Sequence, residues 1–270
     1  MHERISVNSI CFPGASLADL ARHWGQLGAG RVSFVSSQLS DDDLGNVQAL
    51  LAVGGHRVET ITHVFTDTLV AHQEGLHEAR TRLSRLINTA REIGARSIYM
   101  LTGGRGAMSW EEAADAFSAA VAPCVAEARA AGVALAVENA LPLLAHVHMA
   151  HSLRDAITLA EMAGIGVCID LFGCWTEAGL DALIERAVPR CAVVQVSDYV
   201  LGDRSLPARA VPGDGVIPLA HIVKCLLTAG YANQFDLELI GPRIDTEGHF
   251  EATRRAALNV GNMLRGMGVQ

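Results

Sequence analysis

Short apolar runs alternate along the chain with amphipathic stretches of helical spacing. The apolar runs are rich in β-branched residues and predict eight strands, approximately at residues 4–10, 31–36, 57–65, 97–101, 133–139, 166–172, 192–199 and 235–240. The stretches between them, such as residues 16–29, 111–132 and 219–230, predict helices. Strands of this composition are typical of parallel sheets that are buried on both faces.

Capping residues mark where several of these helices begin and end. Serines suited to the N-cap position precede three helical stretches: Ser16, Ser109 and Ser152. Glycines suited to a helix C-terminus follow four of them: Gly94, Gly132, Gly164 and Gly230. Together with the strands, these signals indicate a repeated β-α unit.

Eight β-α units in succession favour a closed barrel over an open sheet. An open doubly wound sheet would carry a G-x-G-x-x-G turn after an early strand, whereas the first turn here reads CFPGAS. No linker or low-complexity stretch interrupts the units, and 270 residues is close to the roughly 250 that one barrel needs. We therefore expect an α/β fold with one domain, an eightfold β/α barrel, over residues 1–270.

The overall charge and composition exclude several classes of partner. The net charge of −8 argues against general binding to nucleic acid or to an anionic membrane, because both attract Lys and Arg. No apolar run approaches the roughly 20 residues that span a bilayer. The six cysteines are scattered and form no C-x-x-C pair or disulfide framework. With no signal-peptide pattern, we expect a cytoplasmic protein, and a mean hydropathy of +0.26 favours a homo-oligomer.

Oxygen-bearing side chains end four consecutive predicted strands: Glu138, Asp170, Gln195 and Glu238. Barrel active sites lie at the C-terminal ends of the strands, and adjacent strands are about 4.8 Å apart, so the four side chains can converge. Three neighbouring acids repel one another unless a cation offsets their charge. Carboxylate and carboxamide oxygens suit a hard divalent ion. The pattern predicts a metal site, and the alternative is that each residue caps a helix or pairs with a surface Arg.

Four further residues near predicted strand ends are candidates for substrate binding. Arg209, in RAVPGDG, can hold a substrate carbonyl or hydroxyl, or else form a structural salt bridge. Asp198, three residues after Gln195, can bind substrate hydroxyls, support the metal ligands, or begin a turn. His63 can line the pocket or be a structural residue, and Trp175 can form an apolar wall or pack at a helix start.

At these residues the chain resembles the xylose isomerase-like TIM-barrel superfamily, which holds sugar isomerases and epimerases, inosose dehydratase-type lyases and endonuclease IV-type nucleases. The likeness is detailed from VALAVENALP onward and looser before it. The pattern is similar to that of ketose 3-epimerases, which implies that Glu138, Asp170 and Glu238 are metal ligands. The resemblance also implies that Arg209 contacts substrate, and it places Asp198 at the Asp of the family's H-x-x-D motif.

Two positions depart from that family pattern. Gln195 replaces a metal-binding His; it keeps a neutral ligand but offers a carbonyl oxygen, which favours Mn or Mg, while Co, Fe and Zn stay open. Gly173 stands where many relatives have a substrate-binding His, so we expect room there for a different or bulkier substrate.

These observations predict a metal-dependent isomerase or epimerase of a sugar, polyol or other hydroxy-carbonyl compound. The ion would polarise the carbonyl and stabilise an enediolate, while Glu138 and Glu238 take and return a proton. Asp170 and Gln195 would mainly hold the metal.

Three other functions stay open. Loss of a β-hydroxyl from the same enediolate would give a lyase, either inosose dehydratase-like or a glycoside-cleaving enzyme that needs a partner subunit. The net charge of −8 disfavours an endonuclease IV-type nuclease. The retained acids disfavour a barrel that only binds a ligand.

Overall fold

The computed structural model describes residues 1–39, 44–69 and 73–270, and in these residues eight parallel strands close into a barrel. Each strand pairs with the next one in sequence, and β8 pairs with β1. The strands are β1 (Ile5–Asn8), β2 (Arg31–Val35), β3 (Arg57–Val64), β4 (Ser97–Leu101), β5 (Ala134–Glu138), β6 (Gly166–Asp170), β7 (Cys191–Val196) and β8 (Phe235–Leu237). The predicted β/α barrel is confirmed.

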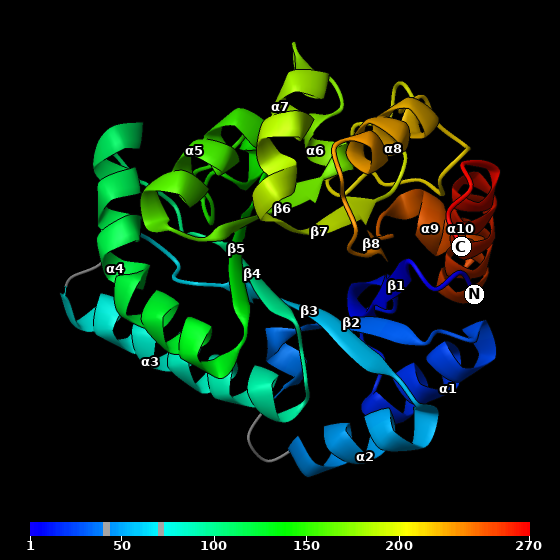
Figure 1. Ribbon diagram of the computed structural model, residues 1–270, viewed down its shortest axis with the longest axis horizontal. Helices are drawn as coiled ribbons and strands as arrows, with labels where there is room; N and C mark the ends of the chain where they lie inside the picture. Colours follow the sequence, from blue (N-terminus) through cyan, green and yellow to red (C-terminus); the bar gives the residue numbers. More distant parts are fainter. Residues whose placement is uncertain (40–43, 70–72) are drawn as a thin grey trace.

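Helices surround the strands (Figure 1). They are α1 (Leu17–Leu27), α2 (Leu44–Gly54), α3 (Gln73–Glu92), α4 (Trp110–Ala131), α5 (Leu153–Ala163), α6 (Leu171–Cys174), α7 (Leu180–Ala187), α8 (Leu219–Thr228), α9 (Pro242–Glu247) and α10 (His249–Gly266). Short 3-10 segments are η1 (Ser9–Cys11), η2 (Ser36–Gln38), η4 (Pro142–Leu144) and η5 (Val188–Arg190). Within the described residues, none of the helices has both the length and the apolar character needed to cross a bilayer.

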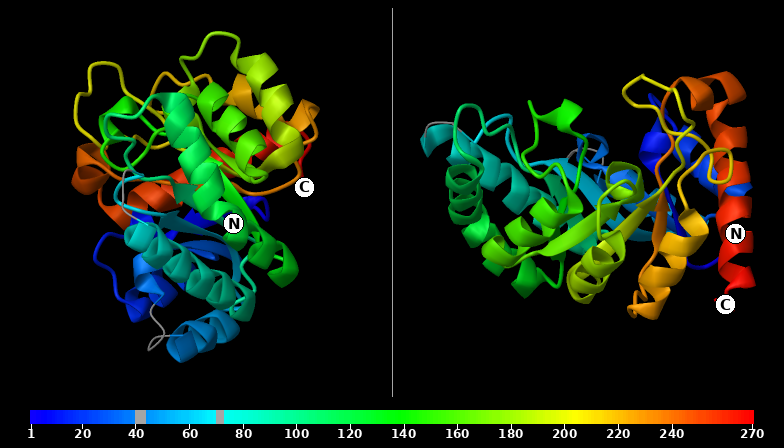
Figure 2. Two further views of the ribbon diagram at one scale, coloured as in Figure 1. Left: turned by 90° about the vertical axis from the view of Figure 1, so that its left-hand side faces the viewer. Right: turned by 90° about the horizontal axis from the view of Figure 1, so that it is seen from above.

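The predicted caps hold these helices in place. Ser16, Ser109 and Ser152 each accept a hydrogen bond from the backbone N–H three residues further on. Gly132 and Gly164 end α4 and α5 in the left-handed conformation that glycine adopts without strain. At the barrel closure, α10 packs against β1 and β8 (Figure 2).

Alternate residues of the strands contribute to two separate clusters of buried side chains. The outward-facing strand residues pack under the helices in the main apolar core, which includes Ile98, Val137 and Ile169. The inward-facing residues form a smaller cluster inside the barrel: Tyr99, Ala136, Cys168 and Val193. Glu138 and Asp170 continue the inward-facing rows of Ala136 and Cys168, because successive strand residues point to opposite faces.

The barrel interior also contains buried polar groups below the strand ends. Asp236, on β8, is fully buried and accepts hydrogen bonds from Ser6 Oγ at 2.5 Å, Ser33 Oγ at 2.8 Å and Asn8 Nδ2 at 2.9 Å. Among the described residues, no positively charged side chain forms a hydrogen bond or ion pair with Asp236. Burial therefore raises the pKa of this carboxyl group to about 6, although the hydrogen bonds oppose the shift.

A second buried acid lies near the start of β3. Glu59 is 3% exposed and forms ion pairs with Arg31 and, at 3.0 Å, with Arg96. Arg96 also donates to Gln234 Oε1 at 2.8 Å. The network joins β2, β3 and β4 to the segment before β8.

The loops that follow β4 and β5 are joined by hydrogen bonds. Gly103 N–H donates to Val147 O at 2.9 Å, and Thr102 N–H donates to Nδ1 of His148 at 3.1 Å. Nε2 of the same buried His148 lies 2.9 Å from Glu138 O, so it donates to that carbonyl. The end of β5 is therefore fixed from the side of β4.

Candidate active site

A cavity of about 220 Å³ lies at the C-terminal ends of the strands, where barrel active sites occur. Three predicted acids and the predicted arginine line it together: Glu138, Asp170, Glu238 and Arg209. The rest of its wall is largely apolar and includes Leu141, Leu144, Phe172, Leu206 and Ile240. Strands β5, β6 and β8 thus bring residues that are distant in sequence to one pocket.

Arg209 joins two of the acids. Its guanidinium donates to both oxygens of Asp170, at 3.0 and 2.9 Å, and lies 2.8 Å from Glu238 Oε1. It also donates to Ser197 Oγ at 3.0 Å and lies 4.9 Å above the ring of Phe172. Burial alone would lower the pKa of Arg209, but the carboxylates of Asp170 and Glu238 more than offset this and raise it. The group is a permanent cation in the pocket.

Asp198 fixes the segment that carries Arg209. Its carboxylate accepts four backbone N–H groups at 2.8 to 3.0 Å, from Tyr199, Gly213, Gly215 and Ile217. Its backbone pairs in both directions with Ala210, next to Arg209. Both carboxylate oxygens are already hydrogen-bonded and Asp198 does not line the cavity, so the structure does not support its predicted contact with substrate hydroxyls. It positions Arg209 instead.

Glu138 has neither a hydrogen-bond nor an ion-pair partner for its carboxylate among the described residues, although the residue is only 7% exposed. Burial is the main reason that the pKa of Glu138 lies well above its usual value, and the charges of Glu238 and Asp170 raise it further. This setting favours the protonated form of the carboxyl group. It faces the cavity and has no competing partner.

Glu238 lies one residue beyond β8 and differs from Glu138 in its surroundings. Burial raises the pKa of Glu238 to about 7, whereas Arg209 lowers it. The same side chain accepts a hydrogen bond from Gln195 Nε2. Two buried carboxyl groups thus share one pocket, and Arg209 favours ionisation of Glu238 more directly than that of Glu138.

Gln195 faces the barrel interior beneath the acids. Its Nε2 also donates to Tyr99 Oη at 3.0 Å, and its Oε1 accepts from Cys168 Sγ at 3.3 Å. This assignment of the amide points nitrogen, and not oxygen, at Glu238. Because the nitrogen faces Glu238, the predicted role of Gln195 as a metal ligand requires the amide to turn over. Gln195 also does not line the cavity.

His63 and Trp175 lie away from the cavity. Thr62 forms a hydrogen bond with Tyr99, which lies inside the barrel. Because successive strand residues point to opposite faces, His63 lies on the outer face of β3, where its Nδ1 is 3.1 Å from Ser36 Oγ. Trp175 follows α6 and packs against the ring of Tyr199 at 6.2 Å between centroids. Neither position supports the predicted substrate contact, because both side chains face packed neighbours.

The expectation of extra room at Gly173 is wrong. A Cβ on Gly173 would lie 2.8 Å from Nδ2 of Asn139, so that side chain already fills the space. Asn139 exchanges two hydrogen bonds with the backbone of Asp170, at 2.9 and 3.0 Å. The glycine accommodates this link between β5 and β6.

Three residues of the site escaped the sequence analysis: Thr62, Tyr99 and Ser197. Thr62 and Tyr99 line the cavity and are hydrogen-bonded to each other, while Ser197 accepts from Arg209. Alternation groups Thr60 and Thr62 on one face of β3, but the sequence does not mark that face as the inward one, because β3 is buried on both faces.

The pocket suits a divalent cation in charge and in donor type. Three buried carboxyl groups and one guanidinium leave two negative charges uncompensated when all are ionised, and buried charge without a partner is costly. The unpartnered carboxylate of Glu138 offers a free ligand. Arg209 bridges Asp170 and Glu238. The carboxylate oxygens of the three acids do not all lie within 4.8 Å of one another. Arg209 and an ion would therefore compete for these oxygens.

The chain matches a family model in sequence and many solved structures in fold. Residues 23–259 match the model described as xylose isomerase-like TIM barrel. No curated protein matches the chain significantly in sequence. A protein from Sinorhizobium meliloti 1021 superposes with a TM-score of 0.84 at 22% identity, covering 98% of both chains.

Two further solved structures have informative descriptions. The IolI protein with a binding zinc atom has a TM-score of 0.82 at 14% identity and covers 97% of this chain and 98% of its own. D-psicose 3-epimerase from Clostridium cellulolyticum H10, solved with D-tagatose, has a TM-score of 0.76 at 14% identity and covers 97% of each chain. At these identities the likeness establishes the fold alone.

Proposed function

Because the chain belongs to the xylose isomerase-like TIM barrel family, we propose that it is an isomerase or epimerase of a small polyhydroxylated carbonyl compound. The observation that carries the proposal is the buried pair Glu138 and Glu238, which faces one cavity together with the fixed cation Arg209. Proton transfer next to a carbonyl needs a base, an acid and a positive group for the developing oxyanion.

The surroundings of the two glutamates assign their roles. Glu238, ion-paired with Arg209, is the carboxylate that removes the proton from the carbon next to the carbonyl. Glu138, whose carboxyl group has no partner among the described residues and whose pKa is raised, returns a proton to the enediolate in its protonated form, whereas its ionised form would serve as a metal ligand. Epimerisation results when the returned proton reaches the opposite face of the same carbon. Isomerisation results when it reaches the neighbouring carbon and the hydroxyl proton moves to the other oxygen of the enediolate.

Arg209 and Asp170 position the reacting oxygen. The guanidinium is held by both oxygens of Asp170, which fixes its plane beside Glu238. An oxygen that gains negative charge during proton removal is stabilised by this fixed cation. The apolar wall around Phe172 and Leu141 excludes water and strengthens these interactions.

For a metal cofactor, we propose a site with Glu138, Asp170 and Glu238 as carboxylate ligands and Gln195 as the fourth ligand after its amide turns over. An oxygen-rich set favours Mn or Mg. When bound, the ion would supply Lewis-acid polarisation of the substrate carbonyl. IolI, a structural neighbour described with a zinc atom, supports the choice of a divalent ion.

The cavity supports a small substrate. Its volume of about 220 Å³ is below the roughly 300 Å³ at the low end of ligand pockets, which suits a free sugar or polyol better than a polymer. D-Psicose 3-epimerase, another neighbour, was solved with the ketohexose D-tagatose, which supports ketoses as first candidates.

Solvent exchange tests the proposal directly. Protein supplied with Mn²⁺ is incubated in D₂O with ketohexoses, ketopentoses and inososes, and deuterium incorporation is followed by proton NMR. We expect the wild type to exchange the proton next to the carbonyl of at least one compound. Glu238→Gln should abolish the exchange, since its amide cannot accept the proton. Glu78→Gln, which alters an exposed residue on α3, is the matched control and should exchange normally.

Two outcomes would contradict the assignment. Exchange that persists in Glu238→Gln would remove this residue as the base, and the absence of exchange with every compound would reject the proposed reaction. A product that has lost water would assign dehydration from the same intermediate instead.

A further inference from the structure

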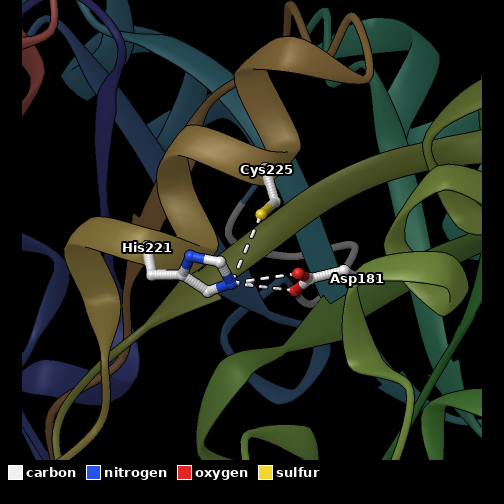
Figure 3. A group of neighbouring side chains, drawn as sticks. All are labelled: Asp181, His221 and Cys225. Carbon is white, nitrogen blue, oxygen red and sulfur yellow. Dashed lines mark hydrogen bonds and ion pairs between the residues drawn. The ribbon is translucent and has the colours of Figure 1, made fainter.

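A second cluster of potential metal ligands lies outside the barrel, between α7 and α8. Asp181 is in the first turn of α7, and His221 and Cys225 are four residues apart on α8 (Figure 3). Residues at this spacing share one face of a helix. Among the described residues, these three side chains are the group of His, Cys, Asp or Glu whose potential ligand atoms all lie within 4.8 Å of one another.

The cluster is separate from the candidate active site. Its three residues line a surface hollow of about 570 Å³ with Glu185 and Lys224, and none of them lines the cavity at the strand ends. The side chains of Asp181 and His221 are each 59% exposed. Solvent ions therefore reach them without passing through the barrel.

One nitrogen atom of His221 faces both other ligands (Figure 3). Its Nε2 lies 3.0 and 3.1 Å from the two carboxylate oxygens of Asp181 and 3.6 Å from Cys225 Sγ. A tetrahedral zinc ion, with Zn–N about 2.0 Å and Zn–S about 2.3 Å, separates nitrogen from sulfur by about 3.5 Å and from a carboxylate oxygen by about 3.3 Å. The observed separations fall within about 0.3 Å of these values.

The surroundings of the thiol favour a cation over a reactive cysteine. The carboxylates of Asp181 and Glu185 line the same hollow as the thiol, together with one ammonium group, that of Lys224. A nucleophilic or redox-active cysteine needs an excess of positive charge beside it instead. An ion bound to the sulfur removes its proton and neutralises the excess of negative charge at the same time.

The donor atoms indicate which ion is bound. Sulfur, imidazole nitrogen and carboxylate oxygen together are typical of zinc, whereas Mg²⁺ and Ca²⁺ require oxygen ligands. We propose that Asp181, His221 and Cys225 form a surface site for Zn²⁺, with a fourth position open to solvent or to Glu185. The ion links α7 to α8 and stabilises the folded chain by mass action.

Cobalt substitution tests the site, because thiolate ligation gives Co²⁺ an intense near-ultraviolet charge-transfer band. Full-length protein is stripped with a chelator and titrated with Co²⁺ and then Zn²⁺, and bound metal is measured by calorimetry. We expect the wild type to show the thiolate band and to lose it when Zn²⁺ displaces Co²⁺. Cys225→Ser should lack the band, and His221→Asn should bind Co²⁺ at least tenfold more weakly.

Two control variants separate this site from the barrel. Asp170→Asn alters the cavity and should leave the thiolate band unchanged, and His77→Asn alters an exposed histidine on α3 and should also leave it unchanged. The proposal is overturned if the wild type shows no thiolate band, if the band survives in Cys225→Ser, or if Asp170→Asn removes it. Deuterium exchange by Cys225→Ser stays normal, so failure of one proposal is distinguishable from failure of the other.

Discussion

Replacement of Asp236 by Asn should remove a defined part of the pH dependence of stability. Asp236 is fully buried inside the barrel, where its carboxyl group accepts hydrogen bonds from two hydroxyl groups and one amide but pairs with no cation in the part of the chain that the structure describes. Burial raises the pKa of Asp236 from 3.8 to about 6 in the folded chain. Between these values the folded protein keeps a proton that the unfolded chain has lost.

The sign and size of the effect follow from this difference. Because the folded state binds more protons, the contribution of Asp236 is most favourable below pH 3.8, and it falls as the pH rises through 6. The rise in pKa from 3.8 to about 6 corresponds to a loss of about 3 kcal/mol in the free energy of unfolding once the carboxylate is fully ionised. The amide introduced by Asp236→Asn cannot ionise, so the stability of this variant relative to wild type should rise by about 2.5 kcal/mol from about pH 4 to about pH 8.

Urea unfolding followed by tryptophan fluorescence at several pH values measures this difference. Groups that do not interact with Asp236 contribute equally to both proteins, and any constant cost of the amide cancels from the pH dependence. Besides burial, the charge of Asp236 also raises the pKa of Glu238, so its removal adds to the difference in the same direction. Asp115→Asn, at an exposed position on α4, is the matched control and should give a difference that does not vary with pH. A pH-independent difference for Asp236→Asn would contradict this prediction, because it would mean that the buried carboxyl group titrates as it does in the unfolded chain.

Four other substitutions test the site and its support. Glu138→Gln should lower kcat by about 10²-fold to 10⁴-fold with little change in KM, and unchanged steady-state kinetics would exclude it as the acid. Arg209→Met should tighten Mn²⁺ binding at least tenfold in a calorimetric titration, because a competing cation is lost from Asp170, and weaker binding would contradict the competition. Glu59→Ala should cost about 1.5–3 kcal/mol in urea unfolding, because it removes charge-assisted hydrogen bonds to two arginines that are themselves 25% and 43% exposed, and a loss below about 0.5 kcal/mol would contradict this. Gly173→Ala should cost about 1–3 kcal/mol in the same assay, because its Cβ would lie 2.8 Å from a fixed side-chain amide, and a stabilised variant would show that this amide moves aside.

The barrel could be predicted because its signals are local. Apolar runs, serine caps and terminal glycines each act within a few residues, and they repeat often enough to fix the order of the elements. The C-terminal ends of the strands follow from that order, so the positions of Glu138, Asp170 and Glu238 at one end follow as well.

The side-chain arrangement in the pocket could not be predicted, because it depends on contacts between distant residues. The spacing of Asp198 from β7 does not reveal that its oxygens are bonded to N–H groups up to 19 residues later. The residues around His63 are buried on both faces of β3, so alternation alone does not show which way the His63 side chain points. The lack of a side chain at Gly173 suggested space, but Asn139 at the end of the preceding strand fills it.

The hydrogen bonds between the loops after β4 and β5 have a consequence for how molecules reach the cavity. His148 and Val147 fasten one side of the mouth to backbone atoms at the strand ends, so local opening there must break several buried bonds at once. Leu206 and Pro207 also line the cavity, and the segment that holds them, residues 200–208, is tethered by a hydrogen bond from Tyr199 Oη to Asp203 O and by the partly exposed ion pair between Asp203 and Arg243. Exposed ion pairs of this kind are weak. We therefore expect residues 200–208 to open more readily than residues 145–150, and amide hydrogen exchange should be faster there.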